Sequence, residues 1–329
     1  MILSAGKLKG IVTDSFGVRA YETVLITGAR AAAKWIYGVA VECQRVGASP
    51  LLSLPSPESH GGKVPQTKFR SVTDDQLLAI AEEIDAWVEV CIPFPRLPRA
   101  KRTRKKPEAG VVMPDWIARI AQRGVRQCSF MVPEGPLRVR DAVTKALEAD
   151  IETMVTLGKK LRKSLASAKN ARITTGLGTD LHLALAGTGV TIDCGKWDPE
   201  LQIDSTIYMP GGVVETLPVE TSASGLAVVP MAYLRRAHSG WIRNLKLHFD
   251  RGKAKALQSK SGLSSFNRIM EETTGDKDVI AEFGIGVNPN VRNLIGSMKL
   301  DELMGGSARV AIGDNYGWLE GKNKSDLHW

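Results

Sequence analysis

Segments of strand-like and helix-like composition alternate through the first half of the chain, and this alternation restricts the fold more than any other feature. A strand followed by a helix and another strand needs a crossover connection, which favours parallel pairing of the two strands. The pattern therefore predicts an open α/β domain with a parallel-type sheet. The expected strands are 22–27, 50–54, 86–91 and 127–132, and the expected helices are 31–46, 74–84, 114–123 and a long stretch at 139–165 interrupted near Gly158.

The second half of the chain has a different pattern, in which short runs of β-forming residues are separated by glycine, proline and aspartate. Leu245, Leu247 and Phe249 alternate with polar residues, as in a strand with one buried face. At 329 residues the chain also exceeds the size of one hydrophobic core. We predict an open α/β domain over 1–170 and a β-rich α+β domain over 171–329. The expected strands of the second domain are 172–175, 181–185, 213–214, 225–229 and 242–249, and its expected helices are 266–272 and 290–294.

The composition is ordinary for a globular protein, with 43% hydrophobic and 24% charged residues, and it excludes a mainly disordered chain. No apolar run approaches the roughly 18 residues that cross a bilayer. The N-terminus lacks the apolar region of a secretory signal, so we expect a cytoplasmic protein. The four cysteines form no CxxC pair, which excludes a zinc ribbon. No GxGxxG follows the first expected strand, so a dinucleotide site is not supported.

Most of the excess positive charge lies in one segment. The formal net charge is +9, and residues 92–107 contain seven basic residues, four prolines and no acid. The prolines exclude a regular helix, so we expect an extended, exposed loop. This loop either makes a weak polyanion contact or is simply solvated, since no aromatic side chain lies between the basic residues for base stacking. These residues are Arg96, Arg99, Lys101, Arg102, Arg104, Lys105 and Lys106.

The C-terminal half contains an ordered series of motifs. In this order and spacing they resemble the C-terminal domain of the aminopeptidase T family of metallopeptidases, and the resemblance covers residues 171–329. It implies an aminopeptidase T-like fold for the β-rich domain. The motifs are AEFGIGVNPN at 281–290, GGSARVAIGDNY at 305–316 and GKNKSDLHW at 321–329, preceded by GTDL at 178–181, MPGG at 209–212 and PVE at 218–220.

In that family two divalent metal ions lie between carboxylates and histidines, with a tyrosine close by. By resemblance, Glu282 and His328 are metal ligands, and Tyr316 is a ligand or a donor to the developing oxyanion. Glu215 or Glu220 is the expected general base. The resemblance implies a hydrolase that forms a homodimer and that releases N-terminal residues from small peptides or cleaves a related amide.

The chain departs from the family pattern at the expected metal site. Val213 stands where the family has a glutamate, and Arg309 stands where it has a histidine. An aspartate expected two residues after His328 would be residue 330, beyond Trp329. Two ions about 3.5–4 Å apart need several negatively charged ligands, and the first two departures move the local charge toward positive by about two units. We therefore predict one divalent ion, zinc, manganese or cobalt, in place of two.

Two alternatives remain open. GTDLH at 178–182, GKWD at 195–198 and PGG at 210–212 are similar to motifs of the 2,5-dihydroxypyridine 5,6-dioxygenases, which have one Fe(II) and a histidine where this chain has Glu282. The first alternative is therefore a ring-cleaving dioxygenase acting on a hydroxylated heteroaromatic small molecule. In the second, Arg309 pairs with Glu282 or Asp314, no metal binds, and the chain is an inactive family member that acts as an interaction protein.

Overall fold

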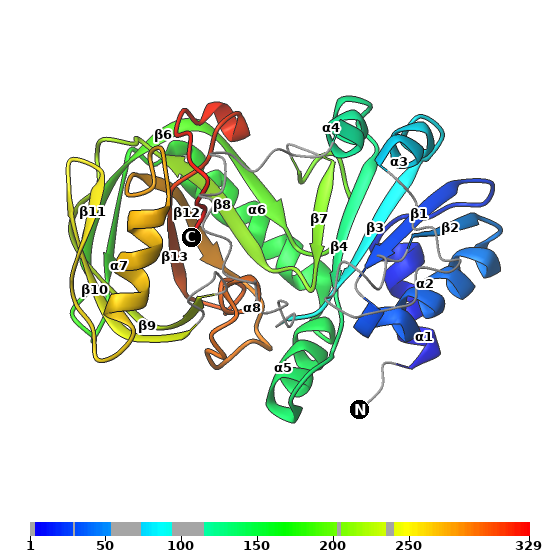
Figure 1. Ribbon diagram of the computed structural model, residues 1–329, viewed down its shortest axis with the longest axis horizontal. Helices are drawn as coiled ribbons and strands as arrows, with labels where there is room; N and C mark the ends of the chain where they lie inside the picture. Colours follow the sequence, from blue (N-terminus) through cyan, green and yellow to red (C-terminus); the bar gives the residue numbers. More distant parts are fainter. Residues whose placement is uncertain (1–3, 29, 54–73, 94–114, 203–204, 235–239) are drawn as a thin grey trace. The chain divides into compact units, whose positions relative to one another are not determined.

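The computed structural model describes residues 4–28, 30–53, 74–93, 115–202, 205–234 and 240–329, which form two compact units (Figure 1). The first unit takes the described residues before 94 together with 115–151 and 193–211, and the second takes 152–192 and the residues from 212 onward. The two units are thus discontinuous in sequence. A single boundary near residue 170 stays a prediction.

The first unit contains a parallel sheet of five strands in the described part of the chain, in the order β2-β1-β3-β4-β7. Its four neighbouring pairs are all parallel, which confirms the expectation of an α/β region with a parallel sheet. The elements of this unit are α1 (Ala5–Gly10), the π-helix η1 (Ile11–Ser15), β1 (Thr23–Gly28), the 3-10 helix η2 (Arg30–Ala32), α2 (Ala33–Val46), β2 (Ser49–Ser53), α3 (Asp74–Ala81), β3 (Ala86–Cys91), α4 (Asp115–Gln122), β4 (Arg126–Met131), α5 (Leu137–Leu147) and β7 (Thr206–Met209).

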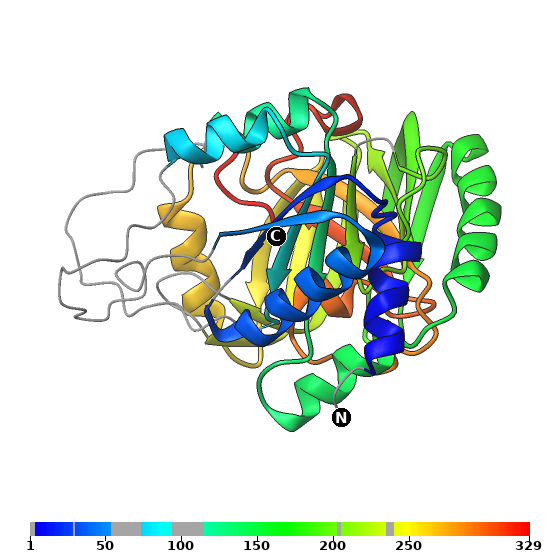
Figure 2. The same cartoon turned by 90° about the vertical axis from the view of Figure 1, so that its right-hand side faces the viewer.

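Strand β1 and helix α2 show how the sequence produces this sheet. Val24, Leu25 and Ile26 are consecutive and buried, as in a parallel strand that is covered on both faces. Helix α2 ends at Gly47, whose φ of 89° is left-handed and suits glycine at a helix C-terminus. Helix α2 packs against β1 and β2, the blue strands beside it in Figure 2. Strand β7 joins the same sheet, although the sequence pattern assigned its residues to the second domain.

The break in the long helical stretch at 139–165 is not at Gly158, where the sequence predicted it. Helix α5 ends at Leu147 and α6 (Ile151–Ser167) continues through Gly158. A Cβ atom on Gly158 would lie 2.7 Å from Cγ2 of Ile192. Glycine is therefore present because the helix approaches a strand closely, a tertiary reason that helix propensity does not contain.

The second unit contains a sheet of eight strands among the described residues, in the order β11-β10-β9-β6-β8-β12-β13, with β5 paired to β6. The registered pairs are antiparallel, as in a β-rich α+β arrangement. Its elements after α6 are β5 (Asn170–Thr174), β6 (Asp180–Asp193), β8 (Val213–Pro218), β9 (Ser224–Leu234), β10 (Gly240–Asp250), β11 (Lys253–Gln258), α7 (Leu263–Glu272), β12 (Ile280–Gly286), α8 (Met298–Asp301), β13 (Ala308–Ile312) and the 3-10 helix η4 (Trp318–Glu320).

One core cluster of the second unit lies between this sheet and α7. Leu245, Leu247 and Phe249 of β10 are all buried, which confirms the predicted alternation. Phe266 and Ile269 of α7 pack into the same cluster. Among the described residues, no helix is long and apolar enough to span a membrane.

The helix expected at 290–294 is wrong, because those residues are not helical and the short helix α8 lies further along the chain. The side chain of Asp301 explains the difference. Its two carboxylate oxygens accept hydrogen bonds from the backbone amides of Ile295 and Gly296, at 2.8 and 2.7 Å. These bonds hold the preceding segment as a loop, since a side-chain acceptor competes with helical hydrogen bonding.

Candidate functional site

Three neighbouring strands bring charged side chains together at one place in the second unit. In the sheet register, Gly284 of β12 lies opposite Glu215 of β8 on one side and opposite Arg309 of β13 on the other. Residues opposite one another point to the same face of a sheet. A Cβ atom on Gly284 would lie 3.0 Å from Cγ of Arg309 and 3.2 Å from Cγ of Glu215. The glycine thus leaves room for the arginine and the glutamate to meet across the middle strand.

Arg309 forms ion pairs with three glutamates, and we call these four residues the Arg309 cluster. Nη1 of Arg309 donates to Oε1 of Glu215 and lies 3.0 Å from Oε2 of Glu302, while Nη2 donates to Oε2 of Glu282. The four side chains are only 12–16% exposed. Glu302 follows α8 and was not identified from the sequence. Arg309 therefore pairs with Glu282, as one alternative expected, and with two further carboxylates.

Burial and neighbouring charge change the proton affinity of this cluster. Burial raises the pKa of Glu215 to about 7, Arg309 opposes this, and the nearby carboxylates of Glu282 and Glu302 add to it. Burial alone would lower the pKa of Arg309, but the three carboxylates outweigh burial and raise it. At neutral pH the cluster thus combines a fixed positive charge with a carboxyl group close to its own titration point.

His328 lies beside the cluster with a defined ring orientation. Its Nδ1 is 2.8 Å from the backbone carbonyl oxygen of Asp314. A carbonyl oxygen can only accept, so Nδ1 is the donor, and in the neutral ring Nε2 carries the lone pair. Nε2 lies 3.5 Å from Oε2 of Glu282. With a neutral ring, two acceptors face each other across this gap, an arrangement that suits a shared cation.

The C-terminal segment is held in place by pairing with the end of β13. Ile312 and Trp329 exchange two backbone hydrogen bonds of 2.8 and 3.0 Å, and Gly313 forms a bridge with His328. Oε1 of Glu220 accepts hydrogen bonds from the backbone amides of Lys322, at 2.7 Å, and Asn323, at 3.2 Å. Glu220 therefore anchors the segment that carries His328.

The predicted site residues thus lie in three places. Glu215, Glu282 and His328 come together around Arg309, whereas Glu220 contacts the C-terminal segment. Tyr316 is 61% exposed, and Nζ of Lys324 lies 3.9 Å from the centroid of its ring.

The residues present fit one divalent ion better than two. Three carboxylates against one guanidinium leave two negative charges when all are ionised, which one divalent ion balances. At an effective dielectric constant of about 20, unit charges about 4 Å apart interact by about 4 kcal/mol, so a second divalent ion would add repulsion of roughly twice that from the guanidinium. Among the described residues, no group of three or more His, Cys, Asp or Glu side chains is arranged to hold a metal. An ion at Glu282 and His328 would therefore complete its coordination with water or substrate.

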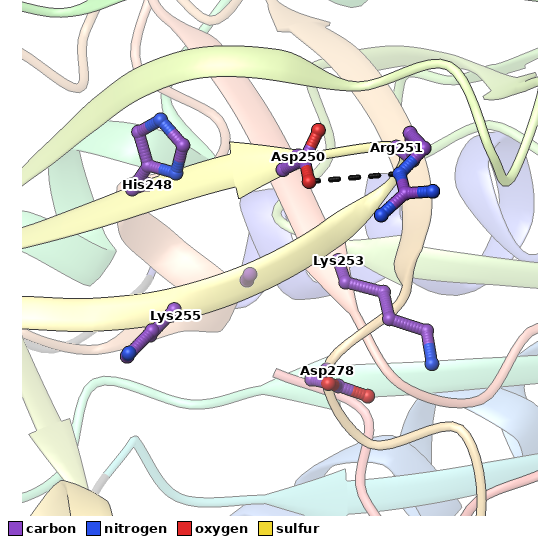
Figure 3. A pocket seen from close by; sticks show the side chains of 7 residues that line it. His248, Asp250, Arg251, Lys253, Lys255 and Asp278 are labelled. Atoms are coloured by element: carbon purple, nitrogen blue, oxygen red, sulfur yellow. Dashed lines mark ion pairs between the residues drawn. The ribbon is translucent and has the colours of Figure 1, made fainter.

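A separate shallow pocket of about 740 Å³ lies at the hairpin of β10 and β11 (Figure 3). Its charged side chains are mostly exposed, and Asp250 and Arg251 within it pair at 3.6 Å. It does not include the Arg309 cluster or His328. The lining residues are His248, Asp250, Arg251, Lys253, Ala254, Lys255 and Asp278.

Comparison with known proteins identifies the fold. No protein-family model matches the sequence, and curated proteins show no match to it. The structure is similar to 2,5-dihydroxypyridine dioxygenase from Pseudomonas putida KT2440, with 16% identity, a TM-score of 0.66 and coverage of 99% of this chain and 91% of that one. It is also similar to wild-type aminopeptidase T from Thermus thermophilus, with 14% identity, a TM-score of 0.64 and coverage of 98% of this chain and 90% of that one.

This chain therefore has the fold of aminopeptidase T and of the dioxygenase over nearly its whole length. Both resemblances that the sequence motifs indicated are confirmed at the level of the fold. At these identities, the activity has to be argued from the chain's own residues.

Proposed function

We propose that this protein is a hydrolase of the aminopeptidase T type, releasing N-terminal residues from small peptides or cleaving a related amide. The observation that carries the proposal is that Nε2 of His328 lies 3.5 Å from Oε2 of Glu282, with the His328 ring oriented by the carbonyl of Asp314. The shared fold with aminopeptidase T supports it.

In this proposal, Glu282 and His328 hold one divalent ion, zinc, manganese or cobalt. Nitrogen and oxygen donors of this kind suit all three metals. When bound, such an ion polarises a carbonyl group and lowers the pKa of a bound water.

Glu215 is the proposed general base. Its pKa of about 7 suits a group that must both take up and release a proton at neutral pH. Its carboxylate accepts a proton from water as the water oxygen bonds to the amide carbon, and returns it to the nitrogen as the C–N bond breaks. Arg309 fixes the position of this carboxylate through the ion pair. Glu220, the other candidate, already accepts two backbone hydrogen bonds, so its proposed role is to position the C-terminal segment. Tyr316 remains the proposed donor to the oxyanion.

The second candidate function is a ring-cleaving dioxygenase with one Fe(II). It is favoured by the buried Val213, which lies opposite Gly286 and provides no carboxylate for a second metal. The fold shared with 2,5-dihydroxypyridine dioxygenase supports it equally.

Metal analysis combined with two activity assays distinguishes these functions. We expect one zinc, manganese or cobalt per chain, hydrolysis of dipeptides and aminoacyl anilides, and a loss of at least about 100-fold in Glu282→Gln and His328→Gln. His248→Gln is the control, because His248 is an exposed histidine of β10 that lies in the separate pocket and not in the Arg309 cluster. Iron together with oxygen consumption on a hydroxypyridine would instead support the dioxygenase. A protein with neither metal nor activity would overturn both and favour an interaction protein.

The proposed assembly is a cytoplasmic homodimer with a weak polyanion contact through the basic segment 92–107. Most of this segment lies outside the described residues. Light scattering after gel filtration tests the dimer. Binding to heparin at increasing salt tests the contact, which should weaken steeply and disappear when the segment is deleted.

A further inference from the structure

We propose that Arg309 is a permanent internal cation that takes the place of a second metal ion among Glu215, Glu282 and Glu302, and that it holds Glu282 toward His328. This inference deepens the proposed function, because it explains why the site would take one ion. Its test depends on metal uptake and stability, so it can fail or succeed independently of peptidase activity.

The first support is the way the sheet admits the guanidinium. Arg309 comes from β13, and the absence of a side chain on Gly284 lets it extend across β12 toward Glu215 of β8. The guanidinium is planar and has five N–H donors, so one group can serve several carboxylates. Here Nη1 serves Glu215 and Glu302 while Nη2 serves Glu282. The carboxylate oxygens that a second ion would need are thus already directed at Arg309.

The second support is charge. A guanidinium cannot be deprotonated in a protein, so it supplies its positive charge under all physiological conditions. When all three carboxylates are ionised, they carry two negative charges more than the guanidinium balances, which is the charge of one divalent ion and not of two. Arg309 therefore neutralises Glu215 and Glu302, which is the role that a second metal ion would otherwise have.

The third support is the position of Glu282. The same oxygen, Oε2, accepts from Nη2 of Arg309 and lies 3.5 Å from Nε2 of His328. The ion pair with Arg309 therefore fixes the oxygen that faces the histidine. Arg309 is thus a positioning residue for the Glu282–His328 pair.

The test replaces Arg309 by alanine and by histidine in the full-length protein. Metal content after dialysis against zinc or manganese, and the thermal unfolding midpoint with and without EDTA, are measured for each protein. Wild type is expected to take up at most one ion per chain. Arg309→Ala and Arg309→His are expected to take up one ion more than wild type, with a midpoint that EDTA lowers further than in wild type.

Guanidinium ion tests separately whether the three carboxylates need a cation at this position. In Arg309→Ala without metal, low-millimolar guanidinium chloride is expected to raise the midpoint, because the free ion can enter the space that the side chain vacates. Sodium chloride at equal ionic strength is the salt control. Arg172→Ala is the residue control, since Arg172 forms an exposed pair with Asp180 and should gain neither metal nor guanidinium response.

Two results would overturn the inference. One is a wild-type protein with two ions per chain, and the other is an Arg309→Ala protein that folds but gains no ion. If alanine and histidine variants do not fold, Arg309→Lys replaces them. A lysine keeps the positive charge but lacks the planar set of N–H donors of a guanidinium. It is therefore expected to lower the thermal unfolding midpoint without raising metal uptake. An additional ion in Arg309→Lys would contradict the proposal.

Discussion

Replacing Glu215 with glutamine is expected to remove a pH dependence from the free energy of unfolding. The folded-state pKa of Glu215 is raised from 4.5 to about 7, first because the carboxyl group is buried. Below pH 4.5 the group is protonated in both the folded and the unfolded chain. As the pH rises from 4.5 to about 7, the unfolded chain loses this proton first, so the folded state loses stability over that window. A glutamine side chain does not ionise and has no such loss.

The size of the effect follows from the pKa difference. Each pKa unit corresponds to about 1.4 kcal/mol, so a change from 4.5 to about 7 gives roughly 3 kcal/mol over the whole window. Between pH 5 and pH 8 the expected part is roughly 2 to 3 kcal/mol. Arg309, Glu282, Glu302 and Lys299 act on the pKa of Glu215, so their effects are already contained in the value of about 7.

Urea unfolding at pH 5 and pH 8 measures this difference. The experiment is done in EDTA so that no metal competes with protons for the carboxylates. Tryptophan fluorescence and circular dichroism are both followed, because coincident transitions are needed for a two-state free energy. Glu271→Gln is the matched control, since Glu271 is an exposed glutamate on α7 and its removal should leave the wild-type pH dependence unchanged.

The reasoning fails if wild type and Glu215→Gln change in parallel. A difference below about 0.5 kcal/mol between their pH 5 to pH 8 changes would mean that Glu215 ionises in the folded state as it does in the unfolded chain. The candidate for general base would then have no special proton affinity.

Three further substitutions test the fold and the site. Arg309→Met leaves three buried carboxylates without their cation and is expected to cost about 3–5 kcal/mol at pH 8 in EDTA, measured by urea unfolding; a cost below about 1 kcal/mol would contradict the cluster. Gly158→Ala places a Cβ 2.7 Å from Ile192 and is expected to lower the free energy of unfolding by about 1–2 kcal/mol despite the higher helix propensity of alanine, so a stabilised variant would contradict the close packing. Glu220→Ala removes the acceptor for two backbone amides and should cost about 1–3 kcal/mol and speed proteolysis of the C-terminal segment, whereas unchanged proteolysis would show that Glu220 does not anchor it.

The parallel sheet could be predicted because it depends on local information. Buried strands such as β1 are continuous apolar runs, and α2 ends at a glycine, so each element is visible in its own residues. Strand β7 could not be assigned in this way. Only four residues long, it joins β4 through parallel hydrogen bonds between segments that are distant in sequence.

Glycine has two different structural roles in this chain, and the sequence alone does not distinguish them. Gly47 ends a helix through its left-handed backbone, whereas Gly158 lies within a helix because Ile192 leaves no space for a side chain. Both are glycines within helical composition. The difference depends on a neighbour that is remote in sequence, so local propensity predicted a break that does not exist.

The part of the candidate site that could be predicted consists of residues that belong to recognisable sequence motifs. Glu282 and His328 were found from motifs, and the structure places them 3.5 Å apart. Glu302 belongs to no strand motif and becomes part of the site only because the loop after α8 returns to Arg309. Arg309 itself was visible as a departure from the family pattern. Its three simultaneous ion pairs could not be derived, because three carboxylates from separate segments had first to be placed around one guanidinium.

The pairing of Gly284 with Glu215 on one side and Arg309 on the other links the strand motif to the Arg309 cluster. The glycine is part of the motif that also supplies Glu282, so the strand that provides the carboxylate also provides the gap through which Arg309 reaches Glu215. A Cβ atom at this position would lie 3.0 Å from Cγ of Arg309 and 3.2 Å from Cγ of Glu215, so both side chains would have to move to make room for it. A histidine at 309 could not reach as far or hold a fixed positive charge at neutral pH. Arginine at 309 and glycine at 284 thus act together at neighbouring positions of the sheet, and their contacts are the basis of the proposal that the site takes at most one metal ion.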